Sequence, residues 1–138
     1  MIDIEPRVYT TIRSALKEEF PNINITGKYT DSPAKFPHVS IEETNNAVDA
    51  SYSSTSDREY AANVTYTVNI YTNTETAKAD AKNIAKIVND TFSVLGFARS
   101  LSQPLPNIDR TIYRYTMRFT ALVSKAYDGE EGHYNTTL

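Results

Sequence analysis

The two histidines are the side chains of this sequence best suited to acid–base chemistry near neutral pH. His38 stands between Pro37 and Val39 at the start of an extended segment, and His133 lies in a tail that contains two glycines. General acid–base catalysis needs the donor within hydrogen-bond reach of the reacting group. No nucleophile or carboxylate is placed by its spacing to meet either ring. We therefore expect His38 to be a structural strand-end residue and His133 to be exposed.

Adjacent glutamates provide a second candidate for chemistry. Glu42 and Glu43 follow one another in a segment expected to be a strand, where neighbouring side chains point to opposite faces. They are therefore poorly placed to share one substrate. Charges at a solvated edge, or a salt bridge across a subunit boundary, explain them better. Glu130 and Glu131, in the tail, have the same interpretation.

Phosphate loops and metal clusters are not visible in the sequence. The four glycines stand apart from one another, whereas the phosphate-binding loops of dinucleotide and nucleoside triphosphate sites need clustered glycines between a strand and a helix. The chain has no cysteine, so it has neither a thiolate nucleophile nor a thiolate metal ligand. The spacing of the His, Asp and Glu residues suggests no metal site. We expect no catalysis, no bound cofactor and no metal.

Basic side chains occur in two patterned groups. Lys78, Lys82 and Lys86 recur every four residues and form a row on one helix face, while Arg114 and Arg118 lie on one side of an expected strand. Such a lysine row is usually a solvated surface. The arginines would pair with carboxylates across strands, or contact a partner or a phosphate. The net charge of −3 argues against broad binding to a phosphate backbone.

The first half of the chain reads as a helix followed by strands. Apolar residues at helical spacing predict a helix over residues 4–20, with Asp3 as its cap and Pro6 in its first turn. A short strand within residues 22–29, a connection over 31–37 and a strand over 38–43 follow. Residues 45–57 are small and polar and predict a hairpin loop with marginal strand content, or an extension that projects from the body.

The second half contains the strongest periodic signals. Apolar and polar residues alternate over residues 60–70, which predicts a long strand with one buried face. Residues 74–95 place an alanine-rich apolar stripe on one helix face, with Thr74 as cap and Gly96 as terminator. A short strand over 97–102, a proline turn over 103–107 and a long strand over 111–124 complete the pattern.

These elements predict an α+β fold, with a mostly antiparallel sheet that has a long and a shorter helix packed on one face. Residues 1–125 would form a single domain, and residues 126–138 a flexible tail. The opposite face of the sheet would be a broad surface of Thr, Asn and Tyr side chains. The residues expected to share one core are Tyr66, Val68, Ile84, Val88, Phe92, Tyr115, Met117 and Phe119.

Length and composition agree with one globular domain. The chain has 138 residues, of which 40% are hydrophobic. No apolar run approaches the roughly 20 residues that span a bilayer, so we expect no membrane association. The N-terminal segment lacks the basic start and apolar stretch of a signal peptide. The protein is therefore expected to stay in the cytoplasm where it is made.

Three stretches of this sequence resemble the tail terminator proteins of long-tailed phages and prophages of Gram-positive hosts. They are YTVNIYTN, the helix ending in AKIVNDTFSVLGF, and ARSLSQPLPNIDRTIYRYTMRFTALVS. The resemblance covers residues 60–124 well, and the N-terminal helix with FPHVSIEE more loosely. Its motifs are patterns of fold and turn, not catalytic signatures.

The resemblance implies a structural protein of the virion, located at the tail or neck and assembled in the cytoplasm of the host. Copies would form a homohexameric ring that caps the tail tube at its final length and then receives the neck or head connector protein. DNA would pass through the ring without specific binding. Two alternatives stay open: a neck, head-completion or tail-tube protein of the same module, and, in another class, a small nucleic-acid-binding α+β module.

Acidic and polar residues of two regions are candidates for the contacts of such a ring. The acidic side chains between residues 42 and 59 would lie near the mouth or lumen, where negative charge keeps DNA from sticking. The Thr and Asn face of the sheet would contribute subunit contacts. The candidate assembly or lumen residues are Glu42, Glu43, Asp49, Asp57, Glu59, Thr65, Thr67, Asn69, Arg114 and Arg118.

Overall fold

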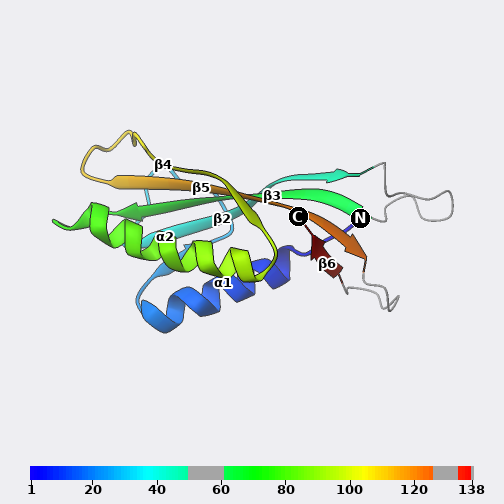
Figure 1. Cartoon of the computed structure of the whole chain (residues 1–138). Coiled ribbons are helices and arrows are strands. Elements are labelled where there is room, and N and C mark those ends of the chain that lie inside the picture. Colours follow the sequence, from blue (N-terminus) through cyan, green and yellow to red (C-terminus); the bar gives the residue numbers. More distant parts are fainter. Residues whose placement is uncertain (50–60, 126–133, 138) are drawn as a thin grey trace.

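Two helices cover one face of a six-stranded sheet (Figure 1). The computed structural model describes residues 1–49, 61–125 and 134–137, with side chains as far as residue 125. Helix α1 spans Glu5–Glu19 and helix α2 spans Ala77–Val94. The predicted α+β class and the placement of both helices on the same face are confirmed. Neither helix of the described chain has the length and apolar character that a bilayer crossing requires.

The sheet is mixed but mostly antiparallel, as predicted. Its strands follow the order β1-β2-β3-β5-β4, and β6 pairs with β5. Only β1 and β2, among the described strands, pair in parallel. The strands are β1 (Asn24–Thr26), β2 (His38–Val48), β3 (Ala61–Thr72), β4 (Ala98–Leu105), β5 (Tyr113–Lys125) and β6 (Tyr134–Thr137).

The start of α1 uses a different residue from the one predicted. Ile4 occupies the N-cap position and makes no side-chain capping bond, but the Asp3 carboxylate accepts a hydrogen bond of 3.1 Å from the backbone N–H of Glu5. Thr74 does not cap α2, whose N-cap residue is Thr76. Gly96 ends α2 as predicted, with a φ of 90° that L side chains rarely adopt.

Strand β2 is longer than predicted. Residues 45–48 were expected to lie in a loop, but they pair with residues 62–65 of β3 after a bulge between Glu43 and Asn45. The correction has a physical cause, because backbone hydrogen bonding to a long neighbouring strand stabilises an extended segment whatever its side-chain polarity. Asp57, from the same predicted loop, and the nearby candidate Glu59 lie outside the described residues.

Strand β4 and the C-terminal segment also differ from the prediction. Strand β4 continues through Pro104 to Leu105, where a turn was expected. Pro104 is accommodated because β4 is an edge strand, which needs donors on one side only. Residues 134–137 pair with residues 122–125 of β5, so the prediction of a flexible tail is wrong for this segment. The rest of the predicted tail lies outside the described residues.

The core lies between α2 and the two long strands β3 and β5. The ring of Phe92 stacks on that of Phe119 with centroids 4.3 Å apart, and Phe97 meets Phe92 edge-on at 5.3 Å. Helix α1 adds the buried side chains of Val8 and Ile12. All eight residues that were predicted to share one core belong to this cluster.

Candidate functional site

Polar side chains lie in rows across the sheet face that carries no helix. Glu42 of β2, Thr67 of β3 and Arg118 of β5 occupy opposing positions, and so do Ser40, Asn69 and Thr116. The side-chain alternation of the strands therefore assembles six of these residues on one face, named here the open face (Figure 1). It includes Glu42, Thr67, Asn69 and Arg118, all predicted candidates.

The connection between β1 and β2 covers one end of the open face. Tyr71 donates a hydrogen bond of 2.7 Å from its hydroxyl to the carbonyl of Thr30. The backbone N–H of Tyr29 donates to the Glu42 carboxylate at 3.1 Å. Asn69, Tyr71 and Thr116 are consequently buried. The prediction of a broad exposed Thr/Asn/Tyr surface is wrong at this end, because a connecting segment folds back over it.

Asn69 is the centre of the covered end. Its side-chain oxygen accepts hydrogen bonds from Arg114 Nε at 3.0 Å and from the Thr116 hydroxyl at 2.7 Å. The guanidinium of Arg114 also lies 5.3 Å from the centroid of the Tyr29 ring. The expected pairing of Arg114 with a carboxylate is therefore replaced by an amide and an aromatic face. This cluster has a structural function, since it satisfies polar groups under the connection.

The other end of the open face is exposed. The hydroxyls of Thr44 and Thr67 lie 3.0 Å apart, and the side chain of Arg118 is exposed beside them. Thr65, which precedes Thr67 by two residues on β3 and therefore lies on the same face, is half-buried. Near the end of the hairpin, the Asp49 carboxylate accepts a hydrogen bond from the Asn63 amide at 3.3 Å. The open face thus keeps a polar, mixed-charge surface that suits contacts with another protein.

Glu43 lies on the face opposite to Glu42, as predicted. Tyr66 donates a hydrogen bond of 3.2 Å from its hydroxyl to the Glu43 carboxylate. Burial raises the pKa of Glu43 and the nearby Glu5 and Asp3 add to this, although the Tyr66 hydrogen bond acts in the opposite direction. Asp3 and Glu5 also line a hollow of about 470 Å³ beside Tyr9. The two glutamates therefore belong to different sites.

His38 is a buried structural residue, as expected. Its Nδ1 lies 2.8 Å from the side-chain nitrogen of Asn24, and its Nε2 lies 3.3 Å from the Thr26 hydroxyl. An amide nitrogen can only donate, so Nδ1 accepts and the ring proton resides on Nε2. Burial lowers the pKa of His38, which keeps the ring neutral.

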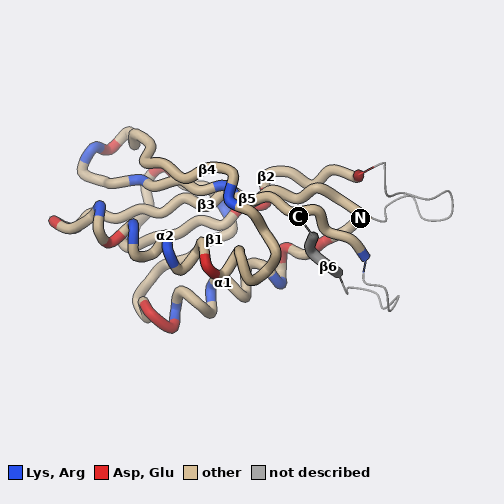
Figure 2. Tube along the Cα trace, in the orientation of Figure 1, with Lys and Arg blue, Asp and Glu red and all other residues tan. Residues whose placement is uncertain are grey.

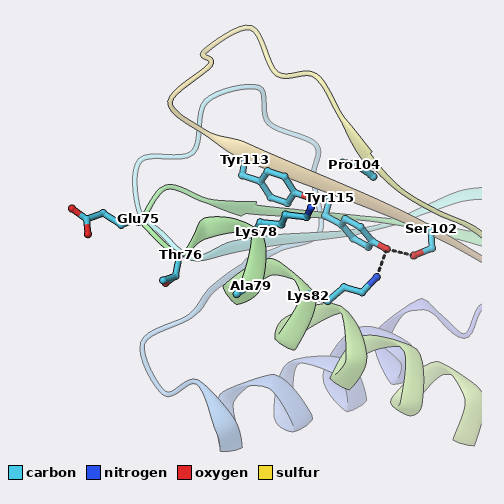
Figure 3. A pocket seen from close by; sticks show the side chains of 9 residues that line it. All are labelled: Glu75, Thr76, Lys78, Ala79, Lys82, Ser102, Pro104, Tyr113 and Tyr115. Carbon is cyan, nitrogen blue, oxygen red and sulfur yellow. Dashed lines mark hydrogen bonds between the residues drawn. The ribbon is translucent and has the colours of Figure 1, made fainter.

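A groove between α2 and strands β4 and β5 was not anticipated (Figure 3). It has a cavity volume of about 780 Å³, and Tyr113 and Tyr115 form its floor. Lys78 and Lys82 extend from α2 along its side (Figure 3). The sequence contained a signal for it, namely the lysine spacing on the helix and the alternating tyrosines on the strand. The sequence did not show that the lysines and the tyrosines lie next to each other.

Tyr115 connects the two walls of the groove. Its hydroxyl lies 2.5 Å from that of Ser102 and accepts a hydrogen bond of 3.3 Å from Lys82 Nζ. Burial acts to raise the pKa of Tyr115, but the hydrogen bonds to Ser102 and Lys82 and the charges of Lys82 and Arg99 bring it below the ordinary value. The lysines and the aromatic floor together suit an anionic group attached to an apolar body.

Metal ligands do not gather in the parts of the chain that the structure describes, where no group of three or more His, Asp or Glu side chains could hold an ion. A scan of the sequence against models of known protein families found no match, and neither did a search of curated proteins.

Proposed function

We propose that this chain is a phage tail terminator, a structural protein whose copies close into a ring on the tail tube and present a second surface to the head connector. The proposal starts from the resemblance of residues 60–124 to that family. In the structure these residues build β3, α2, β4 and β5, which hold most of the core. The resembling segment is therefore the framework of the fold.

The observation that best supports the proposal is the asymmetry of the sheet. Both helices lie on one face, while the other face keeps an exposed end lined by Thr44, Thr67 and Arg118. A domain with one open polar face and open sheet edges suits repeated contacts with identical neighbours. By the resemblance the ring has six copies and belongs to the virion.

The charge of the open face suits a ring through which DNA passes without being held. Glu42 and Arg118 lie on either side of Thr67, so that a carboxylate and a guanidinium occur together at the exposed end. Non-specific DNA binding depends on clustered basic side chains that neutralise phosphates. The alternative of a nucleic-acid-binding module would need such a cluster with exposed aromatic rings, and Tyr71 of this face is buried.

The test is to inactivate the gene in the phage or prophage that carries it and to examine the particles by electron microscopy. A tail terminator predicts tubes of uncontrolled length and heads without tails, and a plasmid copy of the wild-type gene should restore normal particles. Complete tails of normal length beside unfilled heads would instead indicate a head-completion protein. Absence of any tube would indicate the tube subunit.

A further inference from the structure

Two edges of the sheet are open. Strand β2 has 11 residues, and β1 pairs with the first three of them, His38 to Ser40. The chain after β1 then passes Ile41 and Glu42, because Gly27 lies beside the Ile41 carbonyl and the Tyr29 N–H donates to the Glu42 carboxylate, so the outer edge beyond Glu42 remains. Strand β4, at the opposite edge, has eight residues, of which Pro104 has no backbone N–H to donate. No backbone hydrogen bond to the outer side of either stretch occurs within the described chain. Such edges expose donors and acceptors to any strand that approaches.

The directions of these two edge strands are compatible. Each step from β2 to β3, from β3 to β5 and from β5 to β4 is antiparallel, so β2 and β4 run in opposite directions. When two copies stand side by side in the same orientation, β4 of one meets β2 of the next as an antiparallel pair. The sheet would continue across the boundary with all helices on one side. Such a head-to-tail contact forms a ring if the rotation per copy brings the last copy back to the first, and an open filament if it does not.

The edge at β4 is basic. Lys78 and Lys82 line the 780 Å³ groove, and Lys82, Lys86 and Arg99 line a second hollow of about 330 Å³ beside it. Glu75 and Asp90 also belong to these linings, which leaves an excess of positive charge. Figure 2 shows the basic positions spaced along α2 and on the adjoining β4.

The edge at β2 is acidic. Asp3 and Glu5 line the hollow at the start of α1. Figure 2 marks acidic positions of the backbone trace in red in this region. Glu43 of β2 is close enough to both for their charges to disfavour its ionisation. Tyr9 fixes this end of α1 to the sheet edge, since its hydroxyl donates to the carbonyl of Ile25 in β1 at 3.2 Å. A basic surface facing this cluster would relieve the repulsion among its carboxylates.

We propose that neighbouring copies of this chain join through these two edges, with β4 and the lysine row of α2 in one copy facing β2 and the Asp3–Glu5–Glu43 cluster of the next. Opposite charge and opposed strand direction both favour a second copy as the occupant of the groove. The inference rests on the proposed ring and names its subunit contact. It adds a contact between sheet edges to the subunit contacts expected of the Thr/Asn face.

Charge reversal at each edge tests the contact. The basic-edge variant is Lys78→Glu with Lys86→Glu, and the acidic-edge variant is Glu5→Lys. These side chains are exposed. Lys82 and Glu43 are left unchanged, because each forms a hydrogen bond with a tyrosine hydroxyl. Sedimentation velocity at low salt should show a closed oligomer for the wild type. Each variant alone should associate roughly 10- to 100-fold more weakly, because like charges then face one another.

Mixing the two variants is the decisive step. In an equimolar mixture every boundary is complementary when the copies alternate, so the oligomer should return. The control variants are Arg13→Glu with Lys35→Glu, and Glu19→Lys, which lies about 21 Å along α1 from Glu5. These should assemble like the wild type. Thermal melts followed by circular dichroism verify that every variant is folded.

Each outcome decides between the proposals. Loss of the oligomer in both edge variants, with recovery on mixing, supports the edge contact. An oligomer that persists in both edge variants overturns the edge contact and leaves the proposed terminator ring in place. Folded edge variants that lose the oligomer and do not regain it on mixing also overturn the edge contact and leave the proposed terminator ring in place. A wild-type chain that stays monomeric at its highest soluble concentration overturns the edge contact, while the particle phenotype still decides the terminator function.

Discussion

At the scale of single residues, Asn69 holds the covered end of the open face together. Its side-chain oxygen accepts hydrogen bonds from both Arg114 and Thr116, and the Arg114 guanidinium lies over the ring of Tyr29 in the connection between β1 and β2. Replacing Asn69 with alanine should leave these donors without their acceptor and lower the free energy of unfolding by roughly 1–3 kcal/mol. Urea denaturation measures this loss. The exposed Asn63, replaced in the same way, should change stability by about 0.5 kcal/mol or less.

His38 gives a second prediction, on pH. Its folded-state pKa is lowered by burial, whereas the unfolded chain titrates near the ordinary value of about 6.5. The unfolded state therefore binds the proton first as pH falls, and the histidine's contribution to stability decreases from about pH 7 toward its folded-state pKa. Between neutral pH and pH 5, the melting temperature of a His38→Gln variant should fall less than that of the wild type. Equal losses would contradict the buried neutral ring.

Glu43 acts on stability in the opposite direction. Its raised pKa means that the folded chain takes up its proton before the unfolded chain does, so this group favours folding as pH falls. The wild-type melting curve combines both effects. The difference in melting temperature between the wild type and the His38→Gln variant reports the contribution of the histidine alone, because Glu43 is present in both.

At the scale of elements, the packing of α2 on β5 depends on Phe92. The ring is fully buried and stacks on Phe119. Truncating Phe92 to alanine removes the stack and leaves a cavity, which should cost roughly 3–5 kcal/mol of unfolding free energy. Val94, two residues later, is 89% exposed and provides the matched control. Its alanine variant should unfold like the wild type, and a Phe92→Ala variant that does the same would show that α2 packs with another face.

At the scale of the whole molecule, ring formation links stability to concentration. A folded chain that associates is stabilised by mass action, whereas an unfolded chain gains nothing. The melting temperature of the wild type should therefore rise with chain concentration, as measured by differential scanning fluorimetry or calorimetry. The variant with Lys78→Glu and Lys86→Glu should show a smaller rise. A wild-type melting temperature independent of concentration would contradict assembly.

Local sequence patterns determined the elements that carry the core. The two-residue alternation beginning near Tyr60 and the apolar stripe that includes Phe92 are properties of a strand and a helix by themselves, so β3 and α2 were predictable. Gly96 was predictable as the end of α2 for the same reason, because its positive φ is a property of the residue. The opposite directions of Glu42 and Glu43 also followed from strand geometry alone.

The tertiary structure decided which polar groups find partners and which surfaces stay open. Residues 45–48 and residue 104 join strands because neighbouring strands offer backbone hydrogen bonds to them, although their composition favours loops. Asn69 is buried because a connection over 30 residues away in sequence folds across it. The groove at Tyr115 needs α2 and β4 side by side. These features depend on contacts between distant segments, and such contacts leave no local periodicity in the sequence.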